Sequence, residues 1–401
     1  MNDFTFCSPT KFVFGRGVTD RTGAELAELG STRALVVYGQ GSAVRSGTLD
    51  RVLASLDAVG IEHEELGGVR PNPEVGLVRE GIEKARSMHA DVLLAIGGGS
   101  AIDTAKAIAL GVPLDCDIWE LFERRVQPVA EGKLPVASVL TIPAAGSEAS
   151  ESSVITNDEF CLKRGFSSQL NRPVLAIMDP ELTFTLPAYQ TAAGVTDMIV
   201  HIMERYFSST GPVPVTDNIA TGLIKALMYE APRALENPCD YEARANIMWA
   251  STLAHNDLAG LGRNAVPFKR AGGWESHALE HELSAHDPSI THGAGLAVIV
   301  PAWLRFAWDA NPERILSFGR EVFGIEESTS DSIEATADKT IDALQAFFVS
   351  LGMPSHLSEL GVTEDDIPAL LTTLEHNKGP VFGDLKPLSI EDARTIYESA
   401  L

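Results

Sequence analysis

The stretch DVLLAIGGGSAIDTAKAIAL, residues 91–110, decides the fold of the first half of this chain. Its apolar run predicts a buried strand, the three glycines at 97–99 predict a tight turn, and the remainder predicts a helix that opens at Ser100. Glycine lets a ligand approach the backbone closely, and a helix N-terminus presents free N–H groups to an anion. The turn therefore predicts a phosphate or pyrophosphate site, although the GxGxxG fingerprint is absent. A plainer interpretation, which can hold at the same time, is a glycine turn with Ser100 as helix cap and Asp103 as its capping-box partner.

On both sides of this stretch, short apolar runs alternate with amphipathic helical patterns. Such alternation predicts a largely parallel sheet with helices on both faces. The N-terminal segment FTFCSPTKFVFG, residues 4–15, alternates aromatic residues around a turn-like SPT and predicts a hairpin on the sheet edge. The expected strands lie at 33–39, 61–68, 91–97, 135–143 and 173–180, and the expected helices at 48–60, 74–89 and 100–110.

The pattern changes in the second half of the chain. After DPELTFTLP, residues 179–187, strand signals stop and helical patterns follow one another. We therefore expect an α/β domain over residues 1–185 and an all-helical domain over residues 186–401. The Gly-rich and basic segment 260–273 is expected to be a linker or surface loop. The clearest helical patterns lie at 215–236, 241–259, 332–351, 363–377 and 389–400.

The composition excludes several classes of function. A net charge of −24, from 31 basic and 55 acidic residues, argues against binding to nucleic acid or to an anionic membrane. The N-terminus lacks the pattern of a secretory signal, and no apolar run approaches the roughly 20 residues that span a bilayer. The four cysteines are scattered without a CxxC pair, which indicates reduced thiols. We expect a cytoplasmic protein.

Histidines gather in two segments of the second half. Asp197 and His201 lie four residues apart in AAGVTDMIVHIMERYF, residues 192–207, on one face of an expected helix. Burying both is costly unless something satisfies them. One Asp and three neutral imidazoles that converge from separate helices would bind a divalent metal such as Fe²⁺ or Zn²⁺. The further candidates, in the segment 274–295, are His277, His281, His286 and His292, the last expected before a glycine turn.

Several motifs occur in a fixed order along nearly the whole chain. In this order they resemble the iron-containing (group III) alcohol dehydrogenases, in particular the butanol dehydrogenase branch. The resemblance implies an N-terminal dinucleotide-binding α/β domain, an all-α C-terminal domain, and a metal and active site in the cleft between them. The motifs are PNPEV (71–75), AIGGGSAIDTAKAIA (95–109), IPAAGSEAS (142–150), AAGVTDMIVHIMERYF (192–207), HALEHELSA (277–285) and THGAGLAVIVP (291–301).

The resemblance also implies roles for individual residues. His281, one turn after His277, would stand beside the substrate and the nicotinamide and take part in catalysis. The implied metal ligands are Asp197, His201, His277 and His292. The glycine turns and the resemblance together assign cofactor binding to Gly39, Gly41, Ser42, Asn72, Gly97, Gly98, Gly99, Ser100, Asp103, Thr141 and Lys163.

The expected function is that of a metal-dependent NAD(P)H-linked alcohol dehydrogenase or aldehyde reductase acting on short-chain alcohols and aldehydes such as butanol and butanal. The metal would act as a Lewis acid, and the nicotinamide would carry the hydride. The alternative is a metal-dependent lyase of the dehydroquinate-synthase kind, which shares this architecture. Such a lyase requires a basic pocket, whereas Lys and Arg are sparse around the expected ligands.

The turn VVYGQGSAVRSG, residues 36–47, indicates the cofactor preference. Gly39 stands where NAD-preferring relatives carry an Asp, whose carboxylate would repel a 2′-phosphate. Gly41 and Ser42 offer backbone N–H groups and a hydroxyl, and Arg45 lies nearby. NADP(H) is therefore expected to be favoured over NAD(H), although a turn of this kind can also tolerate both. A homodimer formed through the N-terminal strands is expected as well.

Overall fold

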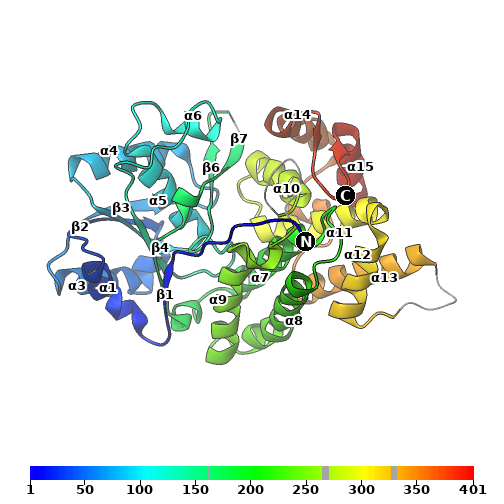
Figure 1. The fold of residues 1–401 in the computed structure, drawn as a ribbon, viewed down its shortest axis with the longest axis horizontal. Coiled ribbons are helices and arrows are strands. Elements are labelled where there is room, and N and C mark those ends of the chain that lie inside the picture. The colour runs from blue at the N-terminus through cyan, green and yellow to red at the C-terminus, as the bar shows by residue number, and fades with distance from the viewer. Residues whose placement is uncertain (161, 264–270, 327–331) are drawn as a thin grey trace. The chain divides into compact units, whose positions relative to one another are not determined.

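The structure, a computed structural model, describes residues 1–160, 162–263, 271–326 and 332–401 (Figure 1). The chain divides into two compact units. The first, which we call the α/β unit, comprises Cys7–Leu186 and Pro238–Thr252. The second, which we call the helical unit, comprises Met1–Phe6, Pro187–Asn237 and Leu253–Leu401. Half of the loop expected at 260–273, namely 264–270, lies outside the described residues, as does Cys161.

The α/β unit is built around a six-stranded sheet in which neighbouring strands are parallel, as predicted. Its order is β1-β8-β5-β4-β2-β3, so β3 extends the sheet from β2 towards one edge, whereas β4, β5 and β8 extend it towards the other. The direction of strand addition therefore changes between β2 and β4. Ligands of open α/β sheets bind at such a switch point, outside the carboxyl ends of the strands. The strands are β1 (Lys11–Phe14), β2 (Arg33–Gly39), β3 (Glu62–Val69), β4 (Val92–Gly97), β5 (Val136–Leu140) and β8 (Leu175–Met178).

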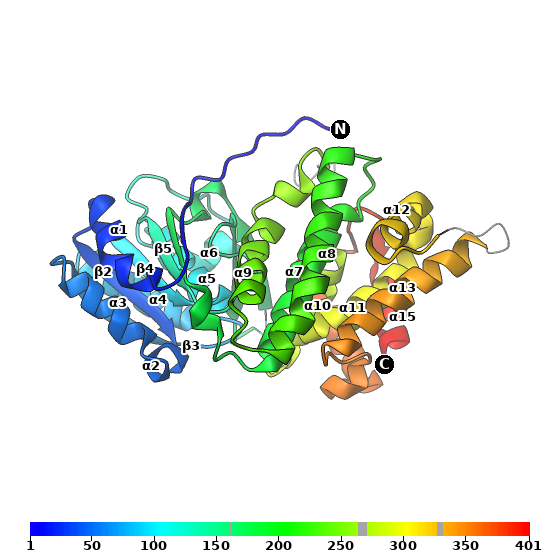
Figure 2. The same cartoon turned by 90° about the horizontal axis from the view of Figure 1, so that it is seen from below.

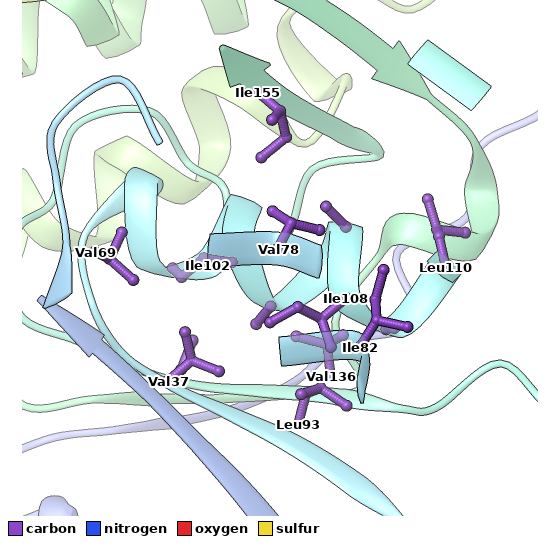
Figure 3. Packing of buried hydrophobic residues seen from close by; sticks show 14 of the residues in the cluster. Val37, Val69, Val78, Ile82, Leu93, Ile102, Ile108, Leu110, Val136 and Ile155 are labelled. Carbon is purple, nitrogen blue, oxygen red and sulfur yellow. The ribbon is translucent and has the colours of Figure 1, made fainter. Parts of the chain in front are cut away.

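Helices cover both faces of this sheet, which explains why its strands read as continuous apolar runs. In β4, Leu93 belongs to the core on one face and Leu94 to the core on the other, and both are fully buried. Figure 3 shows the first of these cores, to which Leu93, Val78 and Ile108 all belong. The helices are α1 (Thr22–Glu28), α2 (Ser42–Arg45), α3 (Thr48–Asp57), α4 (Val75–Ser87), α5 (Gly99–Gly111) and α6 (Ile118–Phe122).

The N-terminal hairpin prediction is wrong. Residues 1–10 form no strand, and β1 pairs in parallel with β8, with Lys11 opposite Leu175. The physical reason lies in the segment SPT: Pro9 has no N–H to donate to a hairpin ladder, while the Thr10 hydroxyl donates to the Pro173 carbonyl at 2.6 Å. The segment is thereby fixed beside β8 rather than folded back on itself.

An antiparallel pair that the sequence patterns did not reveal follows β5. It consists of β6 (Ser152–Asn157) and β7 (Leu162–Ser167) and forms a separate two-stranded sheet. The Val154 N–H of β6 donates to the Asp103 carboxylate of α5 at 2.9 Å, so the pair is tied to the helix that follows the glycine turn.

The helical unit confirms the expected succession of helices. Helix α9 (Tyr241–His255) starts in the α/β unit and ends in this one, and the 3-10 turn Leu258–Gly260 follows it. A pair of two-residue strands, β9 (Val381–Phe382) and β10 (Leu388–Ser389), is a small departure from the all-helical prediction. The other helices are α7 (Ala188–Tyr206), α8 (Pro214–Glu236), α10 (Glu275–His286), α11 (His292–Ala307), α12 (Pro312–Phe318), α13 (Ile333–Ser350), α14 (Ile367–Lys378) and α15 (Ile390–Ala400).

The glycine turn expected after His292 is instead the first turn of α11. A Cβ atom added to Gly293 would lie 2.1 Å from the Ala193 carbonyl oxygen of α7, so glycine here permits close packing of two helices. A Cβ atom at Gly295 would lie 2.8 Å from the Glu280 side chain of α10. Figure 2 shows α7 in the same unit running beside α8. Among the described residues, no helix is both long and apolar enough to cross a membrane.

Candidate active site

Helices α7, α10 and α11 bring four of the predicted metal ligands together. Asp197 and His201 lie one turn apart on α7, with His201 Nδ1 at 3.4 Å from Asp197 Oδ1. His277 of α10 and His292, the first residue of α11, direct Nε2 to the same carboxylate oxygen at 3.8 and 3.7 Å. Three imidazole nitrogens from three helices thus surround one carboxylate oxygen.

These atoms have the character of a divalent cation site. Asp197, His201 and His277 are about 95% buried, each being 4–5% exposed, and their facing atoms all lie within 4.8 Å of one another. Among the described residues, Asp197 Oδ1, His201 Nδ1 and His277 Nε2 find no hydrogen-bond partner. Buried polar atoms without partners are costly, and one carboxylate with neutral imidazoles is a ligand set that suits Fe²⁺ or Zn²⁺. The residues therefore fit a metal.

The electrostatic environment of His201 and Asp197 favours the protonation states that metal ligands need, whereas for His277 the carboxylates of Asp197 and Glu204 outweigh burial and raise the pKa. Burial lowers the pKa of His201 well below its usual value, and the neighbouring His277 and Arg205 lower it further. Burial opposes ionisation of Asp197, but the neighbouring His277 and His292 imidazoles outweigh it and leave its pKa below the usual value. His201 is thus kept neutral and Asp197 ionised.

The other two histidines of this segment occupy different environments. His281 lies one turn after His277, with its ring centroid 6.2 Å from that of His277 and 5.4 Å from that of His292. It is partly exposed and offers a nitrogen near Glu280 and His292. His286 is exposed and contacts Asp366 at 3.2 Å, so it does not belong to the cluster.

Two residues beside the cluster were not expected from the sequence. His255, at the end of α9, places its ring centroid 4.2 Å from that of His201. The Arg205 guanidinium, which can only donate, lies 3.3 Å from His255 Nδ1, so the proton of a neutral His255 sits on Nε2. Trp274 has a positive φ of 60° and packs against His277 at 5.0 Å. Strained backbone of this kind clusters at functional sites, but neither residue lies in a recognisable motif.

Two buried glutamates, Glu204 on α7 and Glu280 on α10, were also missed. Each contacts the far nitrogen of a cluster histidine, Glu204 with His277 and Glu280 with His292. Their spacing carried a usable signal, since Glu204 follows His201 by three residues and Glu280 follows His277 by three. Residues three apart share one face of a helix.

The glycine turn of the α/β unit closes β4 and opens α5 as expected, but the capping-box alternative is wrong. Helix α5 begins at Gly99, its N-cap is Gly98, and no side chain caps it. A Cβ atom at Gly98 would lie 2.9 Å from Ile142, so the loop after β5 packs against the turn and leaves no room for a larger residue. The Thr141 N–H of that loop donates to the Gly97 carbonyl at 3.0 Å. The uncapped helix start is suited to an anion.

Asp103 lies partly buried on α5 after this turn, and its carboxylate already has partners. Its oxygens accept from the Ser147 hydroxyl at 2.5 Å and from the Val154 N–H at 2.9 Å. Lys106, one turn further on and fully buried, donates to Ser147 Oγ at 2.9 Å and to the Ser152 carbonyl at 2.8 Å. Burial lowers the Lys106 pKa to about 8, although Asp103 opposes the shift. This pair fixes the segment 147–154 against α5.

The remaining predicted cofactor residues lie in the same unit. Gly39 ends β2 beside β4, at the switch point of the sheet. Gly41 has φ 146° and precedes Ser42, the first residue of α2, while Arg45 Nη1 approaches to 2.9 Å of a Cβ placed on Gly41. Asn72 follows β3 with a positive φ of 56°, and Lys163 is buried on β7.

Both halves of the chain match one protein family. Residues 9–180 match "Iron-containing alcohol dehydrogenase", and residues 191–401 match "Fe-containing alcohol dehydrogenase family, C-terminal". The "NADH-dependent butanol dehydrogenase A" of Clostridium acetobutylicum is 40% identical over 403 residues, which are 100% of each chain. The "NADPH-dependent aldehyde reductase YqhD" of Escherichia coli is 35% identical over 402 residues, again 100% of each.

A solved structure gives the same result. The crystal structure of "NADH-dependent butanol dehydrogenase A" from Thermotoga maritima has a TM-score of 0.93 and 38% identity, and the match covers 100% of this chain and 99% of that one. These similarities support an alcohol dehydrogenase or aldehyde reductase and give no support to the lyase alternative. The chain belongs to the iron-containing alcohol dehydrogenase family and is a metal-dependent, NAD(P)-linked alcohol dehydrogenase or aldehyde reductase.

Proposed function

We propose that this chain interconverts short-chain aldehydes and primary alcohols, such as butanal and butanol, at a mononuclear Fe²⁺ or Zn²⁺ centre. Asp197, His201, His277 and His292 would hold the metal. The observation that carries this proposal is the convergence of unpartnered Asp197 Oδ1, His201 Nδ1 and His277 Nε2 in a buried place. The relatives named butanol dehydrogenase support the substrate class.

When bound, the metal would supply Lewis acidity towards the substrate oxygen, and the nicotinamide would supply or accept the hydride. The chain's own residues would handle the proton. His281 is partly exposed, lies next to His277 and His292, and is outside the proposed ligand set. We assign it the proton relay between the substrate oxygen and solvent, because an imidazole titrates near neutral pH.

We also propose that residues 1–185 bind the cofactor and residues 186–401 hold the metal. The N–H groups at the start of α5, around Gly97, Gly98, Gly99 and Ser100, would bind the pyrophosphate. Asn72, Thr141 and Lys163 would contact the ribose and nicotinamide side. Asp103 would act indirectly, since both of its oxygens hold the segment 147–154 in place.

NADP(H) is proposed as the favoured cofactor. Gly39 carries no carboxylate to repel a 2′-phosphate, Gly41 and Ser42 begin α2, and the Arg45 guanidinium lies over Gly41. The relatives do not share one preference, because four are named NADH-dependent and two are named NADPH- or NADP-dependent. The proposal therefore depends on the turn itself.

The chain is proposed to form a homodimer through its N-terminal segment. Strand β1 lies at an edge of the six-stranded sheet, and Phe4 and Phe6 are 44% and 40% exposed. Exposed aromatic residues and a strand at a sheet edge both favour association. Replacing both Phe4 and Phe6 by Ser should convert the dimer to monomer in sedimentation velocity. A wild-type monomer, or an unchanged dimer in the variant, would refute this arrangement.

The proposed function is tested by reconstituting metal-free protein with Fe²⁺ or Zn²⁺ and assaying a panel of aldehydes with NADPH and with NADH. Turnover that appears with one metal equivalent and favours four-carbon aldehydes is expected. Full turnover of the metal-free protein, or no turnover of any aldehyde with either metal, would contradict the proposal.

A further inference from the structure

We propose that two buried carboxylates, Glu204 and Glu280, act as positioning residues that orient His277 and His292 and strengthen them as metal ligands. The inference rests on the proposed metal centre and adds to it the residues that set its affinity. Both glutamates are fully buried, and both lie in the helical unit with the histidines they contact.

Glu204 is held rigidly against His277. Its Oε1 accepts from the Ser276 hydroxyl at 2.6 Å, from the His277 backbone N–H at 3.0 Å and from His277 Nδ1 at 3.1 Å. An ionised carboxylate only accepts, so in a neutral His277 the proton is on Nδ1 and Nε2 keeps its lone pair. That lone pair is on the nitrogen 3.8 Å from Asp197 Oδ1, which is the side of the metal cluster.

Glu280 stands in the same relation to His292. Its Oε2 contacts His292 Nδ1, while His292 Nε2 lies 3.7 Å from Asp197 Oδ1. The chain makes room for this carboxylate, since a Cβ atom at Gly295 would lie 3.0 Å from Glu280 Oε1 and 2.8 Å from Glu280 Cγ. His292 is the more open of the two histidines, with 26% of its side chain exposed, so it needs an orienting partner.

The two contacts have one chemical consequence. A carboxylate on the far nitrogen fixes the tautomer and the ring orientation of a ligand histidine and raises its basicity. Glu204 and Glu280 also add two carboxylates behind the histidines that face Asp197, which makes the centre more attractive to a divalent cation. His201 differs from the other two, because it faces Asp197 through Nδ1, the nitrogen nearer the backbone.

The test compares Zn²⁺ affinity, measured by competition with a chromophoric chelator, in wild type, Glu204→Gln and Glu280→Gln. Glutamine retains an acceptor oxygen for Nδ1–H and removes the charge. Each variant should bind Zn²⁺ roughly 10–100-fold more weakly. Glu282→Gln is the matched control, because Glu282 is a buried carboxylate on α10, the helix that also carries Glu280. Glu282 Oε1 accepts from the Asn377 side chain at 2.9 Å. Its Zn²⁺ affinity should equal that of wild type.

Two further measurements separate positioning from folding. In Co²⁺-loaded protein the visible ligand-field bands should shift in Glu204→Gln and Glu280→Gln but not in Glu282→Gln, while thermal unfolding of the metal-free forms reports stability. If one Gln variant fails to fold, the other carries the test. Unchanged Zn²⁺ affinity and unchanged Co²⁺ bands in a folded Gln variant would overturn the proposal, and so would an equal loss of affinity in Glu282→Gln.

The number of Zn²⁺ ions bound per chain distinguishes the remaining outcomes. Glu280, His281 and His292 also lie close enough to bind an ion of their own. Two Zn²⁺ per wild-type chain, falling to one in Glu280→Gln, would make Glu280 a ligand and overturn its positioning role. Failure of wild type to bind Zn²⁺, with His277→Ala no different, would instead refute the proposed metal centre itself.

Discussion

Lys106 beside the glycine turn and Asp197 in the helical unit are both buried charged side chains, but their surroundings differ. Lys106 donates to Ser147, Ser150 and Ser152, so protein atoms satisfy its charge. Asp197 Oδ1 has imidazole nitrogens at 3.4–3.8 Å and finds no hydrogen-bond partner among the described residues. The first arrangement is complete as a protein structure, whereas the second becomes complete when a cation binds. Substitutions in the two places should therefore damage different properties.

The largest expected effect is at Asp197. Asp197→Ala removes the carboxylate that faces the three imidazole nitrogens. Metal affinity should fall by at least the roughly 10–100-fold typical of changes around a metal centre, and turnover should be lost with it. Metal analysis after gel filtration checks this. An Ala variant that retains one metal per chain and full turnover would mean that the ligand assignment is wrong.

The next largest effects should distinguish the role of His281 from that of His277. His281→Ala should keep its metal and lose about 10²–10⁴ in kcat, since that is the usual contribution of a positioned proton relay. His277→Ala should lose the metal, because its Nε2 faces Asp197. The metal content of both variants, measured beside kcat, decides between these roles. Loss of metal from His281→Ala would exchange the two assignments.

On the other side of the comparison, Lys106→Met should affect stability rather than metal binding. It leaves the acceptor oxygens of Ser147, Ser150 and Ser152 without their donor, and each buried polar group left unsatisfied typically costs about 1–3 kcal/mol. Chemical denaturation measures the loss. Lys84→Met is the control, because the Lys84–Glu64 pair is partly exposed and should contribute less than about 1 kcal/mol. Weakened Zn²⁺ binding in folded Lys106→Met would contradict the distinction between the two regions.

The smallest effect is expected at Gly39. A Cβ atom there lies 3.5 Å from the Val69 carbonyl oxygen, an ordinary contact, so Gly39→Asp should fold normally. Its carboxylate should repel a 2′-phosphate and lower the NADPH-to-NADH ratio of kcat/KM by roughly tenfold. Wild type should favour NADPH. A wild-type preference for NADH, or a ratio indifferent to the substitution, would remove the argument for NADP(H).

The difference between the glycine turn and the metal cluster also explains which features could be predicted from the sequence. The glycine turn is local: strand, glycines and helix follow one another, so periodicity predicted β4 and α5. The metal cluster draws on three helices, and only the spacing of Asp197 and His201 was local. Glu204 and Glu280 escaped notice because charged residues on a helix are usually exposed, and their burial depends on tertiary packing.

Two structural predictions made from the sequence were wrong for similar reasons. His292 was expected before a glycine turn, but Gly293 and Gly295 serve helix packing against α7 and α10. Glycine within a helix is locally unfavourable, and only the close approach of a second element makes it favourable. The N-terminal hairpin failed in the same way, because β1 found its partner in β8, more than 160 residues away.

The central claim is that Asp197 and three histidines hold one divalent metal, and X-ray absorption spectroscopy of the Zn²⁺-loaded protein tests it most directly. The account predicts a first shell of nitrogen and oxygen at about 2.0–2.1 Å, with outer-shell scattering from three imidazoles. His277→Ala should remove that signature. A sulfur shell at about 2.3 Å, or scattering from fewer than two imidazoles, would contradict the claim.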